Sequence, residues 1–227
     1  MGNLDTISAI LKGMRLPIIT TAAVGVAVVA AVVQYTVPAA VPALQRGSGP
    51  PDWWRLVTPL FVQTLGWYQV VTNLVTLALV GAAAERHLSR RHWAALFVAG
   101  TAAGQVAAFA WHLPGGGCSI AICGLAGGMV VRLLTGPPGS RWPTMIIVGY
   151  VGALTGWGLA GITAAAVAAL VAVVLPQRVA LAGSVVCAAA LALAEDLHGV
   201  SLLAGMAVST CATLRAGVRR PAGSPSH

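Results

Sequence analysis

Two residues whose side chains together can hydrolyse acyl bonds, a serine and a histidine, stand at the starts of two apolar runs. Ser119 follows the glycine-rich turn Pro114–Gly117 and precedes a long apolar stretch, so it is predicted to begin a helix. The unpaired N–H groups at a helix N-terminus can stabilise the oxyanion that forms when a serine attacks a carbonyl group. His198 begins the last apolar run, and histidine is the usual base for such a serine.

Both residues also have simpler structural interpretations, which the sequence leaves open. Serine is a favoured helix N-cap, because its hydroxyl accepts a hydrogen bond from an unpaired backbone N–H group. His198 closely follows Glu195 and Asp196 and could be an interfacial histidine at the membrane boundary. His112, at the predicted outer end of another helix, is a rival base.

The composition is that of a membrane protein. Hydrophobic residues make up 58% of the 227 residues and charged residues only 8%, whereas about 25% of residues are charged in a soluble domain. This excludes a disordered chain, a coiled coil and an ordinary soluble enzyme. The net charge of +8 is explained by basic cytoplasmic loops, so nucleic acid is not an expected partner. The four cysteines have no spacing typical of a metal site, and we expect neither a metal nor a cofactor.

Eight apolar segments are predicted to form membrane helices in one all-α domain. One of them, 143–157, is short for a full crossing and is either a tilted or re-entrant piece or part of one crossing with the next segment. Residues 1–16 form a predicted cytoplasmic segment, 17–214 the transmembrane domain and 215–227 a basic tail that is expected to be disordered. The predicted helices are residues 17–43, 56–83, 92–112, 119–135, 143–157, 159–175, 178–194 and 198–214.

The basic residues predict how these helices are oriented. With eight crossings and a cytoplasmic N-terminus, eleven of the thirteen lysines and arginines fall in cytoplasmic segments, and only Arg46 and Arg55 fall outside. Three crossings then separate the helix that begins at Ser119 from the one that begins at His198. Both residues are therefore predicted to lie just below the outer surface.

Small residues after His198 favour the close helix contact that would join it to Ser119. Ser201 and Gly205 are four positions apart and so share one face of the last helix.

Four short motifs follow one another along the chain. In order they are Asp52–Arg55 followed by LVTPLF, Gln69 with Asn73, Glu85–Leu88, and Gly117–Ser119 with His198. The first three resemble acidic-x-Trp-Arg, His-x-x-x-Asn and Glu-x-Arg-Leu. In the fourth, Gly117–Ser119 resembles Gly-x-Ser-Gly, and His198 resembles the histidine of His-x-x-Gly-x-x-x-Gly. These are motifs of the rhomboids, a family of polytopic intramembrane serine proteases. The resemblance runs from about Pro51 to Gly205, and the joint order of the motifs is more specific than any one of them.

The resemblance implies a rhomboid-like bundle, with a six-helix core and one extra hairpin between Ser119 and His198. It implies a dyad in which Ser119 attacks the peptide carbonyl and His198 takes its proton, while Asn73 and Gln69 donate hydrogen bonds to the oxyanion. Rhomboids use no third carboxylate, so Asp196 is given no catalytic role.

The same resemblance implies partners and location. The substrates or clients would be transmembrane proteins with unstable helices, reached within the lipid bilayer. The protein is expected in a cell membrane as a multi-pass protein. The Ala-, Arg- and Gly-rich composition favours the inner or plasma membrane of a bacterium.

Four positions depart from the family pattern. Ile120 stands at the second glycine of Gly-x-Ser-Gly, where a β-branched side chain is expected to crowd the oxyanion site. Gln69 replaces a histidine, Cys123 a tyrosine that stacks on the catalytic histidine, and Ser201 the first glycine after His198. The alternative function is therefore an inactive rhomboid-like protein that binds membrane clients. A small transporter is a third class of function. The sequence disfavours it, because transporters commonly have an internal repeat and intramembrane charges, and this chain has no repeat and few such charges.

Overall fold

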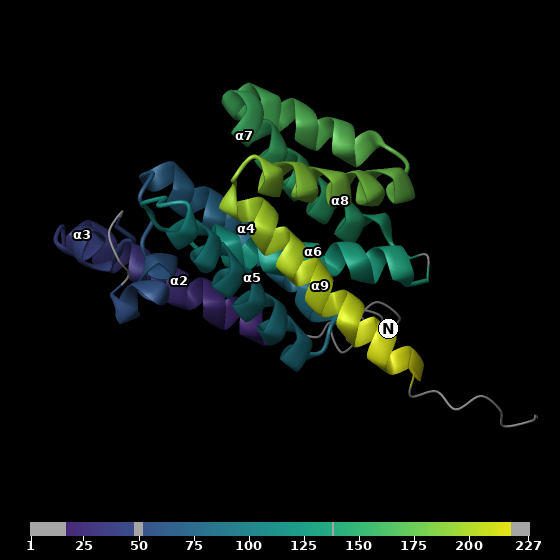
Figure 1. Ribbon diagram of the computed structural model, residues 1–227, viewed down its shortest axis with the longest axis horizontal. Coiled ribbons are helices and arrows are strands. Elements are labelled where there is room, and N and C mark those ends of the chain that lie inside the picture. The colour runs from purple at the N-terminus through teal and green to yellow at the C-terminus, as the bar shows by residue number, and fades with distance from the viewer. Residues whose placement is uncertain (1–16, 48–51, 138, 219–227) are drawn as a thin grey trace, which may run out of the picture.

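The computed structural model describes residues 17–47, 52–137 and 139–218, and this part of the chain is all-helical, as predicted. Figure 1 shows the helices packed into one bundle. The elements are α2 (Ile18–Thr36), α3 (Ala40–Leu44), the 3₁₀ helices η1 (Trp53–Leu56) and η2 (Thr58–Phe61), α4 (Trp67–His87), α5 (Arg90–Ala110), α6 (Ser119–Thr135), α7 (Arg141–Val174), α8 (Gln177–Leu193) and α9 (Leu197–Val218).

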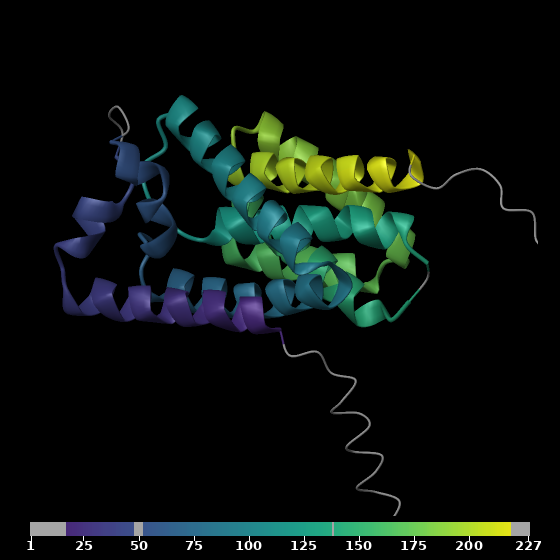
Figure 2. The same ribbon diagram turned by 90° about the horizontal axis from the view of Figure 1, so that it is seen from below.

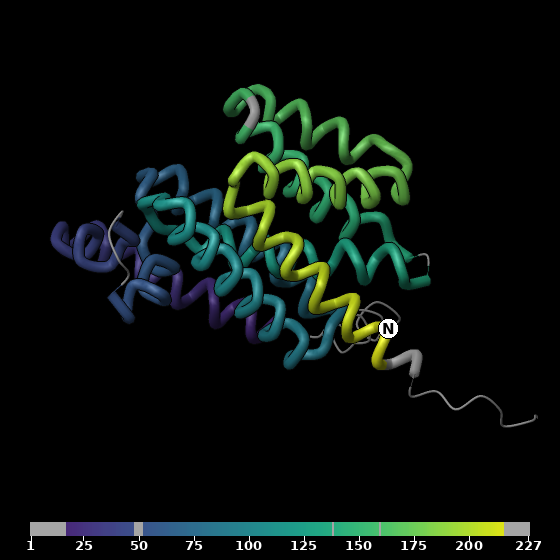
Figure 3. The backbone as a smooth tube through the Cα atoms, in the orientation of Figure 1, coloured from purple at the N-terminus to yellow at the C-terminus, as the bar shows by residue number. Residues whose placement is uncertain are grey.

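A sharp reversal divides α7 into two helices. Ala160 and Gly161 have non-helical backbone angles, and Gly161 has a φ of +79°, which glycine adopts without strain. Figure 3 shows the chain turning back on itself here. The two halves pack so closely that a Cβ at Gly156 would collide with the Ala164 carbonyl. The break was predicted at 156–158 and lies slightly later, since Gly156 serves the packing and Gly161 makes the turn.

With the halves of α7 counted separately, the described residues pass along the bundle eight times, as predicted. This gives the six-helix core and the extra hairpin, and it excludes the interpretation of residues 143–175 as a single crossing.

Two predicted helix boundaries are wrong, for reasons of backbone chemistry. The predicted helix 17–43 breaks at Val37, which has the non-helical angles φ −123° and ψ 89°, because the proline that follows disfavours the helical conformation there. The predicted helix 56–83 begins only at Trp67, after η1, η2 and Gly66 with its φ of +87°. The last helix continues to Val218, so the predicted tail loses its first residues to α9. The predicted segment 1–16 and residues 219–227 lie outside the described residues.

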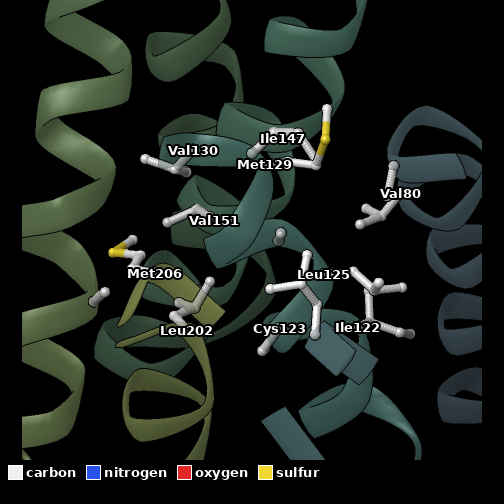
Figure 4. Close-up of a cluster of buried hydrophobic side chains, with 14 of the residues drawn as sticks. Val80, Ile122, Cys123, Leu125, Met129, Val130, Ile147, Val151, Leu202 and Met206 are labelled. Carbon is white, nitrogen blue, oxygen red and sulfur yellow. The ribbon is translucent and has the colours of Figure 1, made fainter. Parts of the chain in front are cut away.

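The central helix is α6, which contacts α4, α5, α7, α8 and α9. Nearly all its residues from Ile120 to Val130 are buried glycine, alanine or larger apolar side chains. Figure 4 shows the apolar cluster around it, to which α4, α7 and α9 also contribute. Glycines bring the backbones together: a Cβ at Gly205 of α9 would collide with the Gly124 carbonyl, and one at Gly100 of α5 would lie 2.5 Å from the Gly124 Cα. The small-residue face predicted for the last helix thus packs directly against α6.

Several helices are suited to crossing a membrane. By length and composition α2, α4, α5 and α9 are long and apolar enough, while α6, the second half of α7 and α8 are shorter apolar helices. Figure 2 shows α3, η1 and η2 at one end of the bundle and the turn between α6 and α7 at the other. Arg46 and Arg55 lie at the first end, whereas the arginines at the α4–α5, α6–α7 and α7–α8 turns lie at the opposite end. The chain is a multi-pass membrane protein.

We predict that both chain termini face the cytoplasm, because the basic end of the bundle should be the cytoplasmic one. Alkaline phosphatase fused after residue 227 should be inactive and green fluorescent protein fused there should fluoresce. The same reporters fused within Pro114–Gly117 provide the control and should give the opposite result. An active phosphatase at residue 227 would reverse the orientation of the whole bundle.

Candidate active site

Ser119 and His198 are brought together by the structure. Ser119 is the first residue of α6, and its Oγ lies 2.9 Å from Nε2 of His198, the second residue of α9. The N-cap of α6 is Cys118, which makes no side-chain capping hydrogen bond. The interpretation of Ser119 as an N-cap is therefore wrong, since its hydroxyl points to the imidazole. His112 is exposed and does not line the cavity that contains Ser119, so it is not placed as the base.

A glycine-rich loop delivers Ser119 to this position. Gly115 and Gly117 have φ angles of +125° and +145°, which other residues rarely adopt. A Cβ at Gly116 would lie 2.7 Å from the Pro59 carbonyl oxygen. The loop consequently packs against the backbone that precedes α4, and only glycine fits at these positions.

His198 also contacts a carboxylate that was given no role from the sequence. Its Nδ1 lies 2.7 Å from Oδ1 of Asp196, and its backbone N–H donates to the same oxygen at 2.8 Å. Burial favours the neutral form of Asp196, but the hydrogen bonds and charge of His198 outweigh it and hold the pKa of the carboxyl below its ordinary value. The Asp-x-His spacing was the signal in the sequence, and the family resemblance led us to discount it.

A cavity of about 300 Å³ contains all four residues predicted for the site. Ser119 and His198 lie in its wall beside Gln69 and Asn73 of α4. The rest of the wall is mainly apolar and comes from α4 and from both halves of α7. Across it, the rings of Tyr68 and Trp157 lie 5.7 Å apart.

The two predicted oxyanion donors are already held by other groups. Asn73 Nδ2 donates to Gln63 Oε1 at 2.7 Å, which leaves its second amide hydrogen for another acceptor. Gln69 Nε2 donates to the Gly116 carbonyl at 3.0 Å, and Gln69 Oε1 accepts from the Leu65 backbone N–H at 2.8 Å. Gln69 thus anchors the glycine loop, whereas Asn73 is the better placed of the two to serve a ligand.

Ile120 does not crowd the oxyanion site, contrary to the expectation from sequence. It is 3% exposed and does not line the cavity. Its side chain lies against α5, where a Cβ at Gly104 would be 2.7 Å from its Cγ2 and would also collide with the Ser201 hydroxyl. The absent side chain of Gly104 therefore makes room for both Ile120 and Ser201, the two residues that replace family glycines.

A tyrosine from another helix lies beside Cys123, where the family motif has its own tyrosine. The Tyr150 hydroxyl of α7 is 3.3 Å from Cys123 Sγ and donates to the Ser119 carbonyl at 3.3 Å. Tyr150 also lines the cavity. Sequence reasoning missed it, because no local pattern shows which residue of α7 faces α6.

Comparison with known proteins gives one match. The family model described as the rhomboid domain matches residues 50–215, which include the glycine loop, Ser119, Asn73 and His198. No curated protein and no solved structure matches the chain significantly.

Proposed function

Because the chain belongs to the rhomboid family, we propose that it is an intramembrane serine peptidase that hydrolyses peptide bonds of transmembrane protein substrates. The observation that carries the proposal is the 2.9 Å contact between Ser119 Oγ and His198 Nε2 in the wall of a cavity. A serine within hydrogen-bond reach of a histidine nitrogen is the arrangement that nucleophilic acyl transfer needs.

The proposed reaction has two halves. Ser119 Oγ attacks the substrate carbonyl carbon while His198 Nε2 takes the hydroxyl proton and then gives it to the leaving amine, so the peptide C–N bond breaks and an acyl-serine forms. A water molecule then attacks the ester, and His198 takes one proton from it and returns it to Ser119 Oγ. Both products leave with the enzyme regenerated.

Oxyanion stabilisation is assigned to groups around the start of α6. The first N–H groups of a helix have no intrahelical partner, so the Ser119 backbone N–H is available to the developing negative charge. The free amide hydrogen of Asn73 adds a second donor, and the remaining amide hydrogen of Gln69 a third.

Asn73→Ala is predicted to lower kcat for cleavage of a model transmembrane substrate by about 10²- to 10³-fold, the effect of removing one oxyanion donor. KM should change little, because the lost hydrogen bond forms mainly in the transition state. Thr76→Ala is the matched control: Thr76 lines the same cavity one turn along α4, but its hydroxyl bonds its own helix. Equal losses of kcat in both variants would remove Asn73 from the oxyanion site.

The cavity supports a membrane protein as substrate. Leu65, Trp157 and Ile162 line it and remain 59%, 46% and 75% exposed, so an apolar segment can approach from the bilayer between α4 and α7. The bacterial plasma membrane is the proposed location.

The second candidate function is a rhomboid-like protein that binds membrane clients without cutting them. The observation favouring it is the set of altered positions beside the dyad, above all Gln69 and Cys123. A fluorophosphonate probe, which reacts with activated serines, separates the two functions. The purified protease should be labelled at Ser119 and lose the label in Ser119→Ala, whereas an unlabelled and inactive wild type would exclude the peptidase and leave the client-binding alternative.

A further inference from the structure

We propose that Asp196 is a positioning residue that holds His198 with Nε2 free to accept a proton, so that Ser119, His198 and Asp196 act as a triad. This deepens the proposed peptidase function and rests on it. It also departs from the dyad that the family resemblance implies.

The two ring nitrogens of His198 have different partners, and these fix the tautomer. An ionised carboxylate can only accept hydrogen bonds, so the 2.7 Å contact with Asp196 Oδ1 requires the proton on Nδ1. In the neutral imidazole Nε2 then carries a lone pair, and it is Nε2 that lies 2.9 Å from Ser119 Oγ. After proton transfer the ionised Asp196 faces an imidazolium and stabilises it without itself taking the proton.

The turn between α8 and α9 fixes Asp196 in place. The Asp196 backbone N–H donates to the Leu191 carbonyl at 2.9 Å and the Glu195 N–H to the Ala192 carbonyl at 3.2 Å. Glu195 has a φ of +56°. These are the two hydrogen bonds and the left-handed residue of a Schellman motif. The carboxylate therefore starts from a backbone position set by the end of α8.

The neighbouring helix lies close to the carboxylate. A Cβ at Gly158 of α7 would lie 3.7 Å from Asp196 Oδ2, an ordinary van der Waals distance, so α7 covers one side of the acid. The side chains of Asp196 and His198 are 29% and 25% exposed. The hydrogen bond between them is thus partly shielded from water, which strengthens the attraction of the carboxylate for the imidazolium that forms when His198 takes the serine proton.

A helix-capping role alone would not account for these contacts. Asp196 precedes α9 and accepts the His198 backbone N–H, as an N-cap residue does. Capping leaves the position of the imidazole free, whereas here Nδ1 is bonded to the same oxygen. Asparagine caps helices as well as aspartate does, so Asp196→Asn keeps the cap and removes the charge.

The experiment compares Asp196→Asn with Glu195→Gln in the purified full-length protein. We expect Asp196→Asn to lower kcat between about 10²- and 10⁴-fold, with KM and the thermal midpoint close to wild type. Glu195→Gln removes the adjacent, exposed carboxylate and should retain wild-type kcat. A kcat of Asp196→Asn equal to that of Glu195→Gln would overturn the triad.

Nitrogen NMR gives a readout that does not depend on cleavage. With histidine labelled with ¹⁵N in the ring, and His198 assigned by its loss in His198→Ala, the wild type should show the Nδ1–H tautomer and Asp196→Asn should lose that preference. An Nε2–H tautomer in the wild type, or an unchanged spectrum in Asp196→Asn, would overturn the proposal. If the wild type neither cleaves substrate nor reacts with the probe, the peptidase function fails, and the spectrum alone decides whether Asp196 positions His198.

Discussion

Ser119→Ala should reduce cleavage of a transmembrane substrate by about 10⁶-fold, to the background rate, which is the cost of losing the nucleophile of a serine hydrolase. Ser119 Oγ is the hydroxyl that His198 contacts at the start of α6. The nearest other nucleophile, Cys118, is buried, and its Sγ is contacted by the Gln63 amide at 3.9 Å. It also lies about 100° around the helix from Ser119, so it cannot take over the attack.

The measurement is cleavage of a tagged substrate by the purified variant in proteoliposomes, with probe labelling in parallel. Ser201→Ala is the matched control, because Ser201 is a buried hydroxyl near Gly104 that bonds the Leu197 carbonyl of its own helix. It should retain activity and label. Undiminished cleavage by Ser119→Ala would defeat the serine mechanism.

His198→Ala should cost nearly as much as Ser119→Ala, because without the base the serine hydroxyl is a poor nucleophile. The imidazole is the acceptor of the Ser119 proton and the donor to the leaving amine, so both halves of the reaction lose their proton carrier. His112→Ala is the control for histidine loss at the same end of the bundle and should keep wild-type activity, since His112 is exposed outside the cavity.

The double variant Ser119→Ala/His198→Ala provides a further check. Residues that act as one unit are strongly non-additive, so the double variant should be no slower than Ser119→Ala. A further large decrease in the double variant, or near-normal activity of His198→Ala, would show that His198 does not work through Ser119.

The sequence predicts correctly the features that depend on local apolar runs or on the number of membrane crossings. Ser119–Thr135 is a single apolar run after a glycine turn, and its predicted and observed bounds coincide. Three crossings separate Ser119 from His198, so the number of crossings alone places both residues at the same end of the bundle. The small-residue face of α9 then explains how the two helices come into contact.

The remaining features depend on which faces of distant helices meet, and the sequence does not contain that information locally. Ile120 was expected to face the oxyanion site, yet it faces α5, because its direction is set by the rotation of α6 within the bundle. Tyr150 of α7 reaches the Ser119 carbonyl across 31 positions of sequence, a contact that no local pattern marks. Asp196 was discounted through a family analogy, although its spacing from His198 is local.

Gly104 couples three helices at this site. Ile120 of α6 and Ser201 of α9 both carry side chains where the family motifs have glycine, and the missing side chain of Gly104 on α5 leaves the space that they occupy. The three positions therefore form one compensated set, in which a change at any member alters the fit of the other two. Motif residues in a divergent relative are best judged together with the surface against which they pack, because a departure on one helix can be cancelled by a residue that no motif includes.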